Sequence, residues 1–523
     1  MFYLHIYITP HFVFVKVGKK MKKTLFIKNA AILTVSPLIL RFAGIIFKVW
    51  LAALIGSEGI GLYHLIFSVY MLASTFASSG LSTAVTRLVA EEMALGSKSG
   101  SLKILRRGIE ITLIIALLSS TAVYFSANYI GSEFIGDLRS VPAIKIMPFS
   151  LPLMGISSCL RGYFIARRKV TPNAFSQLSE QAVRISVVIV LAKTFINKGL
   201  GACLAAVMLG DVISELAGLL LLSVTYIFDS KKLSLLNGRN YPDYRITKRL
   251  AKISLPITGG RYLNTLLRTG ENILVPKALS KYPLGTENVL SSFGMIKGMA
   301  LPILFFPSAI LGAVSTLLIP EMSEAMAKKH SLTVRSACER IIKLTSAVSF
   351  IFAAIFFVSG ERIGIIIYKE PQVGTLIKYL SPIVPLMYLD SVSDGILKGL
   401  DQQNYTFWTA LGDSSLRIVL ITALLPISGL KGFIAIMYFS NILTCLLHLS
   451  RLIKISTARI KMIKEIFLPV SFATVICLVS DTVLSIFDIK ADLVYIMLLC
   501  GIALPIYFIF LWLNGNLNII RNS

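Results

Sequence analysis

The sequence is poor in the residues on which soluble enzymes and metal sites depend. Only 15% of its 523 residues are charged, and the 26 acidic residues are half as many as the 52 lysines and arginines. The five histidines are scattered, and no HExxH helix, GxxxxGK[ST] loop or His/Cys cluster of ligand spacing occurs. These absences argue against a zinc enzyme and a P-loop ATPase. We therefore expect that the protein is not an enzyme and that it has no catalytic residues, no metal and no cofactor.

Disulfide chemistry is equally unsupported. The six cysteines lie in or beside apolar segments, without a CxxC pair and without clustering in one loop, so we expect no disulfide framework. No short apolar segment precedes a small-residue cleavage site, so the first apolar helix is expected to direct insertion. Residues 1–20 are weakly apolar and precede Met21-Lys22-Lys23. We expect Met21 to be the start or residues 1–20 to be poorly ordered, with a short interfacial anchor as the alternative.

Long apolar runs, in contrast, recur along the whole chain. Hydrophobic residues make up 55% of the sequence and the mean hydropathy is +0.77, whereas soluble domains contain roughly 45–50% apolar residues. Each run is long enough to cross a hydrocarbon core about 30 Å thick. The sequence predicts an all-α, polytopic membrane protein with about fourteen transmembrane helices, at residues 27–55, 62–88, 108–130, 142–166, 173–196, 201–228, 250–278, 289–319, 337–359, 376–400, 406–428, 431–453, 465–486 and 491–513.

Positive charge is concentrated in alternate loops. Lys and Arg number 26 in the N-terminal segment, every second loop and the C-terminal tail, whereas the intervening loops hold 7. By the positive-inside rule the first set faces the cytoplasm, so we expect a multi-pass protein of the cell membrane with both termini in the cytoplasm. Anionic membrane lipids, rather than nucleic acid, are the expected partners of the net charge of +26.

Segments of the second half repeat segments of the first at an offset of about 220–237 residues. Residues 159–162 (Cys-Leu-Arg-Gly) correspond to 396–399 (Ile-Leu-Lys-Gly), and 199–201 (Gly-Leu-Gly) correspond to 429–432 (Gly-Leu-Lys-Gly). Six helices per repeat is an even number, which predicts parallel repeats with a cavity between them. The predicted organisation is a cytoplasmic segment 1–26, an N-lobe 27–228, a linker 229–249, a C-lobe 250–453, and two C-terminal helices with a tail in 454–523.

Two acid–base pairs occupy equivalent helices of the repeat. Glu180 precedes Arg184 by four residues, and Asp413 precedes Arg417 by the same interval. Residues four apart share one helical face, so each pair can neutralise itself within the membrane. We interpret both pairs as structural.

Other cations lack an acid of their own. Arg41 lies about 21 Å into its helix and Arg261 about 15 Å into the equivalent helix, and neither has an acid one turn away. Lys48 follows Arg41 by seven residues, and Arg268 follows Arg261 by seven, each on roughly the same face. Of these, Arg268 has an acid one turn on, Glu271. One interpretation is that these cations, with Lys297, snorkel or pair with acids of other helices such as Asp211, Glu215, Asp390 or Asp394. The other is a cationic cavity for a phosphate-bearing substrate, because a guanidinium group matches phosphate oxygens.

Two stretches resemble polysaccharide-flippase-type exporters of the multidrug, oligosaccharidyl-lipid and polysaccharide superfamily. They are residues 56–63 (GSEGIGLY) and 79–92 (SGLSTAVTRLVAEE). Within that superfamily the chain is similar to the stage V sporulation protein B branch, which is related to lipid II flippases. The resemblance implies two six-helix lobes around a V-shaped cavity, two additional C-terminal helices, and export of lipid-linked glycans, with a role in spore cortex peptidoglycan.

The same resemblance implies roles for individual residues. Arg41 falls where lipid II flippases carry a cavity arginine in the first helix, and Lys297 falls near their basic residue in the eighth. The central arginine of their second helix has no counterpart, since Ser74 and Thr75 stand nearby in this chain.

The predicted function is a flippase for an undecaprenyl-diphosphate-linked saccharide, working by alternating access. The proposed substrate-binding residues are Arg41, Lys48, Arg261, Arg268 and Lys297. A cation-coupled multidrug exporter is the first alternative, although acids rather than arginines would suit its cavity. A non-transporting membrane partner of cell-wall synthesis proteins is the second. A membrane glycosyltransferase is disfavoured, because the predicted outer loops are short.

The charge distribution makes the topology testable. A single cysteine in the linker 229–249, in a chain without its native cysteines, should not react with an impermeant maleimide added to intact cells. A cysteine in the outer loop 279–288 should react, as the matched control. Ready labelling of the linker would invert the predicted orientation.

Overall fold

The computed structural model describes residues 23–234, 243–283, 288–309, 311–312, 322, 325–326, 328, 330–459, 461, 463–487, 489 and 491–514. Every regular element among these residues is a helix, as predicted. Eight of the described helices are long and apolar enough to cross a membrane. Residues 1–22 of the predicted segment 1–26, most of the tail 514–523, and the end of the helix predicted at 289–319 lie outside the described residues. The count of fourteen crossings remains a prediction.

The longest helix, α1 (Lys23–Ala94), contains two of the predicted spans. Its 72 residues are interrupted at one position, Gly56, where φ is 71° and ψ is 178°. This φ suits glycine, which carries no Cβ atom. At about 1.5 Å per residue, either part of α1 is long enough to cross an apolar layer about 30 Å thick. The predicted loop at 56–61 is therefore helical except at Gly56. The helical conformation keeps the backbone amides of these residues paired, as a membrane interior requires.

The second half contains a similar long helix, α14 (Gln403–Ser456), which bends at Gly429 with φ of 56°. The predicted loop at 428–431 is thus also a bend in a helix. The other principal helices are α2 (Lys98–Tyr129), α3 (Val141–Ile146), α4 (Ser150–Ala166), α5 (Thr171–Phe195), α6 (Leu200–Ser234), α7 (Asp243–Leu279), α8 (Val289–Gly294), α9 (Leu301–Phe305), α11 (Ser331–Tyr368), α12 (Pro371–Leu380), α13 (Val384–Gly399), α15 (Leu468–Ile486) and α16 (Asp492–Leu513).

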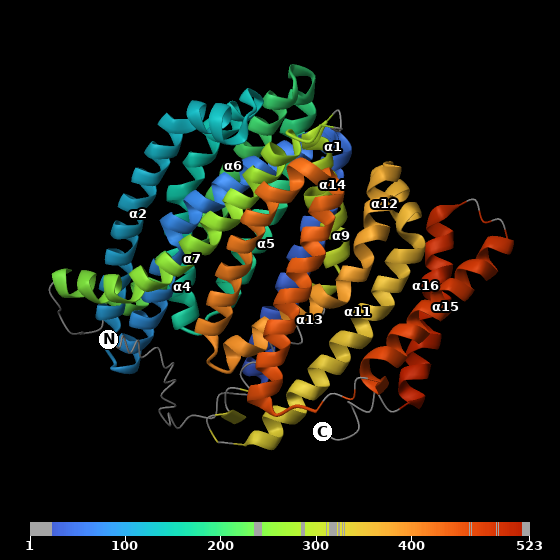
Figure 1. Cartoon of the computed structure of the whole chain (residues 1–523). Coiled ribbons are helices and arrows are strands. Elements are labelled where there is room, and N and C mark those ends of the chain that lie inside the picture. Colours follow the sequence, from blue (N-terminus) through green and yellow to red (C-terminus); the bar gives the residue numbers. More distant parts are fainter. Residues whose placement is uncertain are drawn as a thin grey trace.

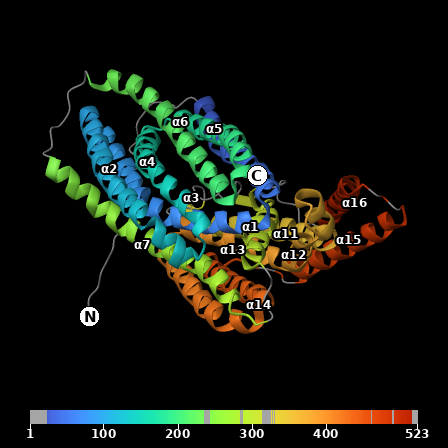
Figure 2. The same ribbon diagram turned by 90° about the horizontal axis from the view of Figure 1, so that it is seen from above.

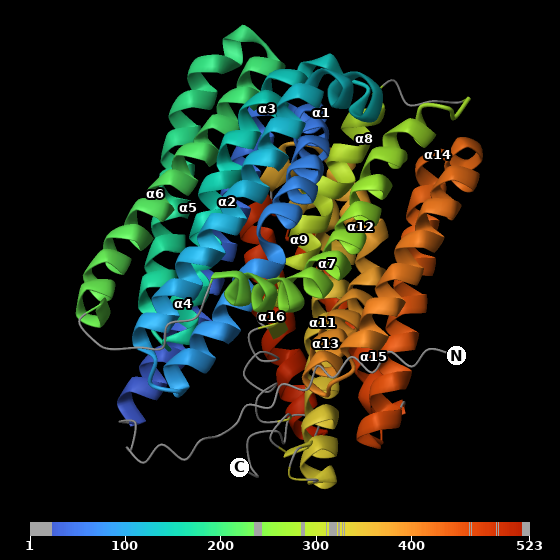
Figure 3. The same ribbon diagram turned by 90° about the vertical axis from the view of Figure 1, so that its left-hand side faces the viewer.

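The helices spread out across the molecule from α2 to α16. In Figure 1, α2, α4 and α6 lie on the left, and α11, α12, α15 and α16 lie on the right. Seen from above, α15 and α16 lie at one end of the molecule, and they pack against α11 (Figure 2). Figure 3 shows α5 and α6 on the side opposite α14. The part of α1 after Gly56 packs along α7.

The backbone shows the internal repeat more clearly than the sequence does. The short helix α3 is joined to α4 through a 3₁₀ turn at Met147–Phe149, and α12 is joined to α13 through a 3₁₀ turn at Ser381–Ile383. The residues Gly199 and Gly429, matched by sequence, both have positive φ angles, of 98° and 56°. Both halves thus bend their helices at matching places.

Close packing joins α1 to the helix that begins at α8. A Cβ atom placed on Gly61 would overlap the carbonyl oxygen of Leu290, and one placed on Gly294 would overlap the carbonyl oxygen of Ser57. The π-helical turn η5 (Met295–Ala300) continues this contact, since a Cβ atom on Gly298 would overlap Ile60. Small residues let membrane helices approach this closely. Van der Waals packing then holds the helices together without a hydrophobic effect between them.

This contact predicts a large difference between two glycine substitutions. Gly294→Ala should separate α1 from α8, because the obstructing atom is backbone and cannot rotate away. Gly501→Ala in α16 is the matched control, since nothing lies within 4 Å of a Cβ atom there. We expect the first change to lower the melting temperature of the detergent-solubilised protein by several degrees and the second to leave it unchanged. Equal melting temperatures would show that the two helices are not in close contact.

Candidate functional site

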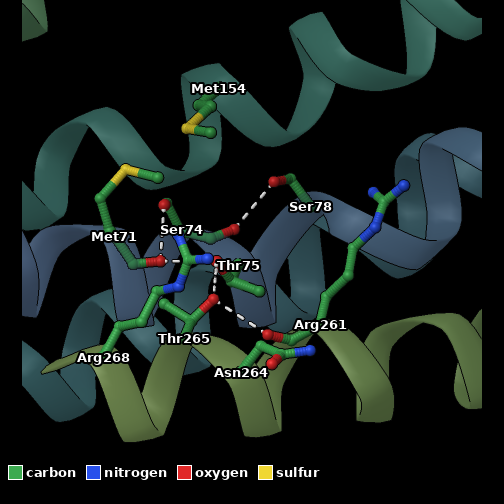
Figure 4. Close-up of a pocket in the computed structure, with 9 residues that line it drawn as sticks. All are labelled: Met71, Ser74, Thr75, Ser78, Met154, Arg261, Asn264, Thr265 and Arg268. Atoms are coloured by element: carbon green, nitrogen blue, oxygen red, sulfur yellow. Dashed lines mark hydrogen bonds between the residues drawn. The ribbon is translucent and has the colours of Figure 1, made fainter. Parts of the chain in front are cut away.

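A pocket of about 380 Å³ lies between α1, α4 and α7. Its floor is α7, which contributes two arginines, and its opposite wall is the second part of α1 (Figure 4). The lining residues are Met71, Ser74, Thr75, Ser78, Met154, Arg261, Asn264, Thr265 and Arg268. Among the described lining residues none is acidic, so the pocket is cationic.

The α7 side of the pocket follows from helical spacing. Arg261 and Arg268 are seven residues apart and both line the pocket, as their spacing predicted. Both residues are exposed within the structure. In Figure 4 the Arg268 guanidinium extends toward Ser74 and Thr75, whereas that of Arg261 extends past Ser78. The two guanidinium groups thus occupy different ends of one polar wall.

The α1 side of the pocket consists of small hydroxyl-bearing residues on one helical face. The Ser74 and Thr75 hydroxyls donate to the carbonyl oxygen of Met71, at 3.0 Å and 2.7 Å, and the Ser78 hydroxyl donates to that of Ser74, at 2.8 Å. Thr75 also lies within 3.4 Å of the Thr265 hydroxyl of α7. Each hydroxyl donates its proton within the helix, so its lone pairs are left for incoming donors.

Lys297, in contrast, is engaged by another helix. Its ammonium group lies 3.0 Å from the Glu271 carboxylate, and Arg417 lies 2.5 Å from the same oxygen. The Glu271 side chain is only 5% exposed and that of Lys297 is 17% exposed. Arg268 also interacts electrostatically with Glu271. One buried carboxylate therefore serves several cations, and Lys297 does not line the pocket of α7.

The pair Asp413/Arg417 is looser than its spacing suggested. The two side chains are 3.9 Å apart, while Arg417 is much closer to Glu271. Asp413 instead accepts a hydrogen bond from Ser440 at 2.5 Å. The long-range partner is preferred because Glu271 is almost fully buried, and a buried carboxylate needs compensating cations.

The equivalent pair in the first half belongs to a larger network. Arg184 lies 3.2 Å from Glu180 within α5, and 2.8 Å from Asp211 of α6. Arg161 of α4 lies 2.6 Å from Glu180. The network thus connects three helices, where the sequence suggested a pair within one.

Arg41 and Lys48 lie apart from the residues that line the pocket. Arg41 is exposed on the first part of α1, next to Phe42, whose ring packs edge-on against Phe306 at 4.8 Å. Lys48 is half-buried and, together with Lys297, acts electrostatically on His64. Neither cation forms an ion pair within 4 Å among the described residues. The structure therefore brings Arg261 and Arg268 together and keeps Arg41 and Lys48 elsewhere on α1.

Polar contacts surround the bend of α1 at Gly56. Arg139 lies 2.6 Å from Glu58, and the same carboxylate accepts a hydrogen bond from Asn288 at 2.9 Å. The hydroxyls of Ser57 and Ser291 are 2.6 Å apart. These side chains join the bend of α1 to residues of both halves.

Sequence reasoning missed the hydroxyl wall. The resemblance to lipid II flippases marks Ser74 and Thr75 only as the place where the arginine of the second helix has no counterpart. The available signal was the spacing of Ser74, Thr75 and Ser78, which puts three small polar residues on one face of an otherwise apolar helix.

Comparison with known proteins identifies the family. The family described as "Polysaccharide biosynthesis protein" matches residues 26–326, which is more than half of the chain. The chain is 30% identical to "Stage V sporulation protein B" of Bacillus subtilis strain 168 over 466 residues, covering 87% of this chain and 88% of that protein. The chain belongs to this family of polysaccharide biosynthesis proteins. The resemblance stated from residues 56–63 and 79–92 is thereby confirmed.

More distant relatives share the fold. "Lipid II flippase MurJ" of Bacillus subtilis is 21% identical over 80% of this chain and 81% of its own length. A solved structure, "Lipid II flippase MurJ, inward closed conformation", covers 91% of this chain with a TM-score of 0.68 and 14% identity, and is covered over 98% of its length. An inward-facing multidrug transporter of the MATE family covers 81% of this chain with a TM-score of 0.62 and 13% identity, over the whole of that transporter. The chain is thus a multi-pass membrane protein with a transporter fold.

The Glu271 cluster predicts a large effect for a small substitution. Glu271→Ala should leave Lys297 and Arg417 buried without their shared partner, at a cost of about 3–5 kcal/mol. Glu361→Ala is the matched control, because its ion pair with Lys378 has the same 3.0 Å length but is 57% and 40% exposed, so the expected cost is about 0–1 kcal/mol.

Protein abundance in membranes and the melting temperature after purification are the measurements. Glu271→Ala should reduce both, while Glu361→Ala should reduce neither. Equal behaviour of the two variants would mean that Glu271 is not the centre of a buried ion cluster.

Proposed function

We propose that this chain is a flippase that moves a lipid-linked saccharide of the undecaprenyl-diphosphate type across the cytoplasmic membrane. The observation that carries the proposal is the pocket in which Arg261 and Arg268 face a wall of hydroxyls. A diphosphate offers several anionic oxygens, and guanidinium groups bind such oxygens through paired, charge-assisted hydrogen bonds.

The rest of the pocket suits the sugar end of such a molecule. Asn264 and Thr265 lie between the arginines on α7, and Ser74, Thr75 and Ser78 lie opposite. Amide and hydroxyl groups bind sugar hydroxyls through hydrogen bonds that they can both donate and accept. The names of the relatives, one a lipid II flippase and one a sporulation protein, agree with a peptidoglycan or polysaccharide precursor as substrate and with a role in spore cortex synthesis.

Transport would proceed by alternating access between two lobes. We assign residues 27–228 and 250–453 to these lobes, with 229–249 as the linker and 454–523 as an addition, both termini being cytoplasmic. The contacts of Ser57 with Ser291 and of Glu58 with Arg139 and Asn288 would close the outer end of the cavity. These are few, polar and partly exposed contacts, which are inexpensive to break and re-form.

We assign Arg41 and Lys48 as cations that the substrate contacts at another stage of the transport cycle. They lie on the first part of α1, where Phe42 packs against Phe306. Lys297 acts differently, because its contact with Glu271 fixes it between α7 and α14. Anionic membrane lipids, and cell-wall synthesis proteins that use the exported lipid, are the proposed partners.

A cation-coupled multidrug exporter is the second candidate, favoured by the MATE transporters among the structural neighbours. The lining of the pocket argues against it, since an organic cation would meet two arginines and, among the described lining residues, no carboxylate. A non-transporting partner of a cell-wall synthesis complex would need no pocket of this kind.

Replacing the pocket arginines tests the proposal. Charge-assisted hydrogen bonds contribute roughly 1.5–3 kcal/mol each, so Arg261→Ala or Arg268→Ala should weaken binding of undecaprenyl diphosphate about tenfold or more. Arg261→Lys should recover only part of the affinity, because an ammonium group lacks the planar fork. Arg41→Ala should abolish transport while membrane abundance stays near normal. Arg245→Ala, on α7 but outside the pocket, is the matched control.

Binding to the purified protein should be measured with undecaprenyl diphosphate and, separately, with an organic cation such as ethidium. Loss of diphosphate binding in the pocket variants but not in Arg245→Ala supports the flippase. Unchanged diphosphate binding in Arg261→Ala and Arg268→Ala, or tighter ethidium binding by the wild-type protein, would contradict it.

A further inference from the structure

The first half contains a buried carboxyl group that the proposed substrate site does not use. Glu215 lies on α6 one turn after Asp211, facing the network of Arg161, Glu180 and Arg184. The residue is 6% exposed. Three acids and two arginines meet in this network, so it carries one negative charge too many if all five groups are ionised.

The contacts of Glu215 resolve this imbalance. Its carboxyl group interacts electrostatically with that of Glu180, and its Oε2 atom accepts no hydrogen bond from any residue that the structure describes. Both arginines are directed at the other acids, since Arg161 contacts Glu180 and Arg184 contacts Glu180 and Asp211. Two adjacent carboxyl groups in a membrane interior share a proton, because both cannot be ionised at close range. One proton on Glu215 leaves two anions with two cations.

The matching position of the internal repeat carries no acid. Residues 211–216 (Asp-Val-Ile-Ser-Glu-Leu) correspond to 441–446 (Asn-Ile-Leu-Thr-Cys-Leu) at the offset that joins Gly199 to Gly429. Glu215 therefore matches Cys445, whose side chain is buried in the second half. A small neutral side chain fills this position in one copy of the repeat, whereas the other copy has a proton-binding group.

A short chain of contacts joins Glu215 to the pocket. Tyr70 of α1 interacts electrostatically with both Glu215 and Asp211. Its hydroxyl accepts a hydrogen bond from Ser150 at 3.1 Å and donates one to the sulfur of Met154 at 3.7 Å. Met154 lines the pocket, and so does Met71, the neighbour of Tyr70. A change of charge at Glu215 therefore acts on two helices, α1 and α4, that form the pocket wall.

We propose that Glu215, sharing a proton with Glu180, is the coupling site at which one proton is bound and released during each transport cycle. The proton would move inward as the substrate moves outward, with Arg161, Arg184, Asp211 and Tyr70 as the charged or titratable groups around it. Loss of the proton leaves an excess anion beside Glu180, which destabilises this arrangement of α1, α4, α5 and α6. The inference rests on the proposed function, which supplies the substrate that is exchanged for the proton.

The protonated carboxyl group can be observed without any transport. Infrared spectra of the wild-type protein in lipid at neutral pH should contain the carbonyl band of a protonated, buried carboxylic acid, and the band should disappear at high pH. Glu215→Gln should lack the band, and so should Glu215→Cys, which introduces the residue found in the second half. Asp481→Asn is the matched control, since Asp481 is bonded to Tyr495 in the added helices α15 and α16. Absence of the band from the wild-type protein, or its persistence in Glu215→Gln, overturns the proton site.

Coupling is tested with fluorescent lipid II in proteoliposomes. For a one-proton exchange, a gradient of about one pH unit, acidic on the side to which substrate is exported, should raise the leaflet ratio of the substrate up to about tenfold. Glu215→Gln and Glu215→Cys should lose this response, whereas Asp481→Asn should keep it. A wild-type protein that moves lipid II without responding to the gradient overturns the coupling role. A protein with the infrared band that moves no lipid-linked saccharide overturns the proposed function instead, so the two failures are distinguishable.

Discussion

The cost of placing charge within a membrane determines how this molecule is arranged. An ionisable side chain at the bilayer centre costs roughly 2.5–3.5 kcal/mol even on moderate scales, and this chain contains many such side chains. Several of them are collected into two networks, one around Glu180 in the first half and one around Glu271 in the second. These networks contain Arg161, Arg184 and Arg417, whereas Arg261 and Arg268 line the α7 pocket, and Arg268 also interacts electrostatically with Glu271.

The internal repeat explains where these networks lie. Each half places an acid–base pair on equivalent helices, at Glu180/Arg184 and Asp413/Arg417, and each connects it to the following span, through Asp211 or Ser440. The copies have then diverged in charge. The network of the first half has three acids and two arginines, with Glu215 where the second half has Cys445. The network of the second half has two cations on one carboxylate. The two halves of the repeat thus differ in the charge of their ion networks.

Much of the fold could be predicted from the sequence, because the signals involved are local. Apolar runs of membrane length and alternating loop charge indicate a polytopic helical protein, and the motifs at 56–63 and 79–92 indicate its family. The bends at Gly56 and Gly429 could not be distinguished from loops, since the only sequence signal for a single residue with positive φ is the glycine itself. The spacing of Arg261 and Arg268 correctly predicted a shared face.

The partners of the charged residues could be predicted only in part. Helical spacing suggested that Arg417 pairs with Asp413, but Glu271, 146 residues earlier in the chain, lies closer. Lys297 had no acid within its helix, and its partner is that same residue. Contacts of this kind depend on how helices are placed against one another, which periodicity does not specify. The same holds for Arg41, whose position in the equivalent helix suggested a shared site with Arg261 that the pocket does not contain.

The most direct test of this account is the movement of a lipid-linked saccharide by the purified protein. Wild-type protein reconstituted in liposomes with fluorescent lipid II in one leaflet should transfer it to the other, as detected by an impermeant quencher, and protein-free liposomes should not. The transfer should stop when Arg261 and Arg268 are both replaced by alanine. Liposomes in which the wild-type protein accumulates ethidium but transfers no lipid II would contradict the account and identify a multidrug exporter.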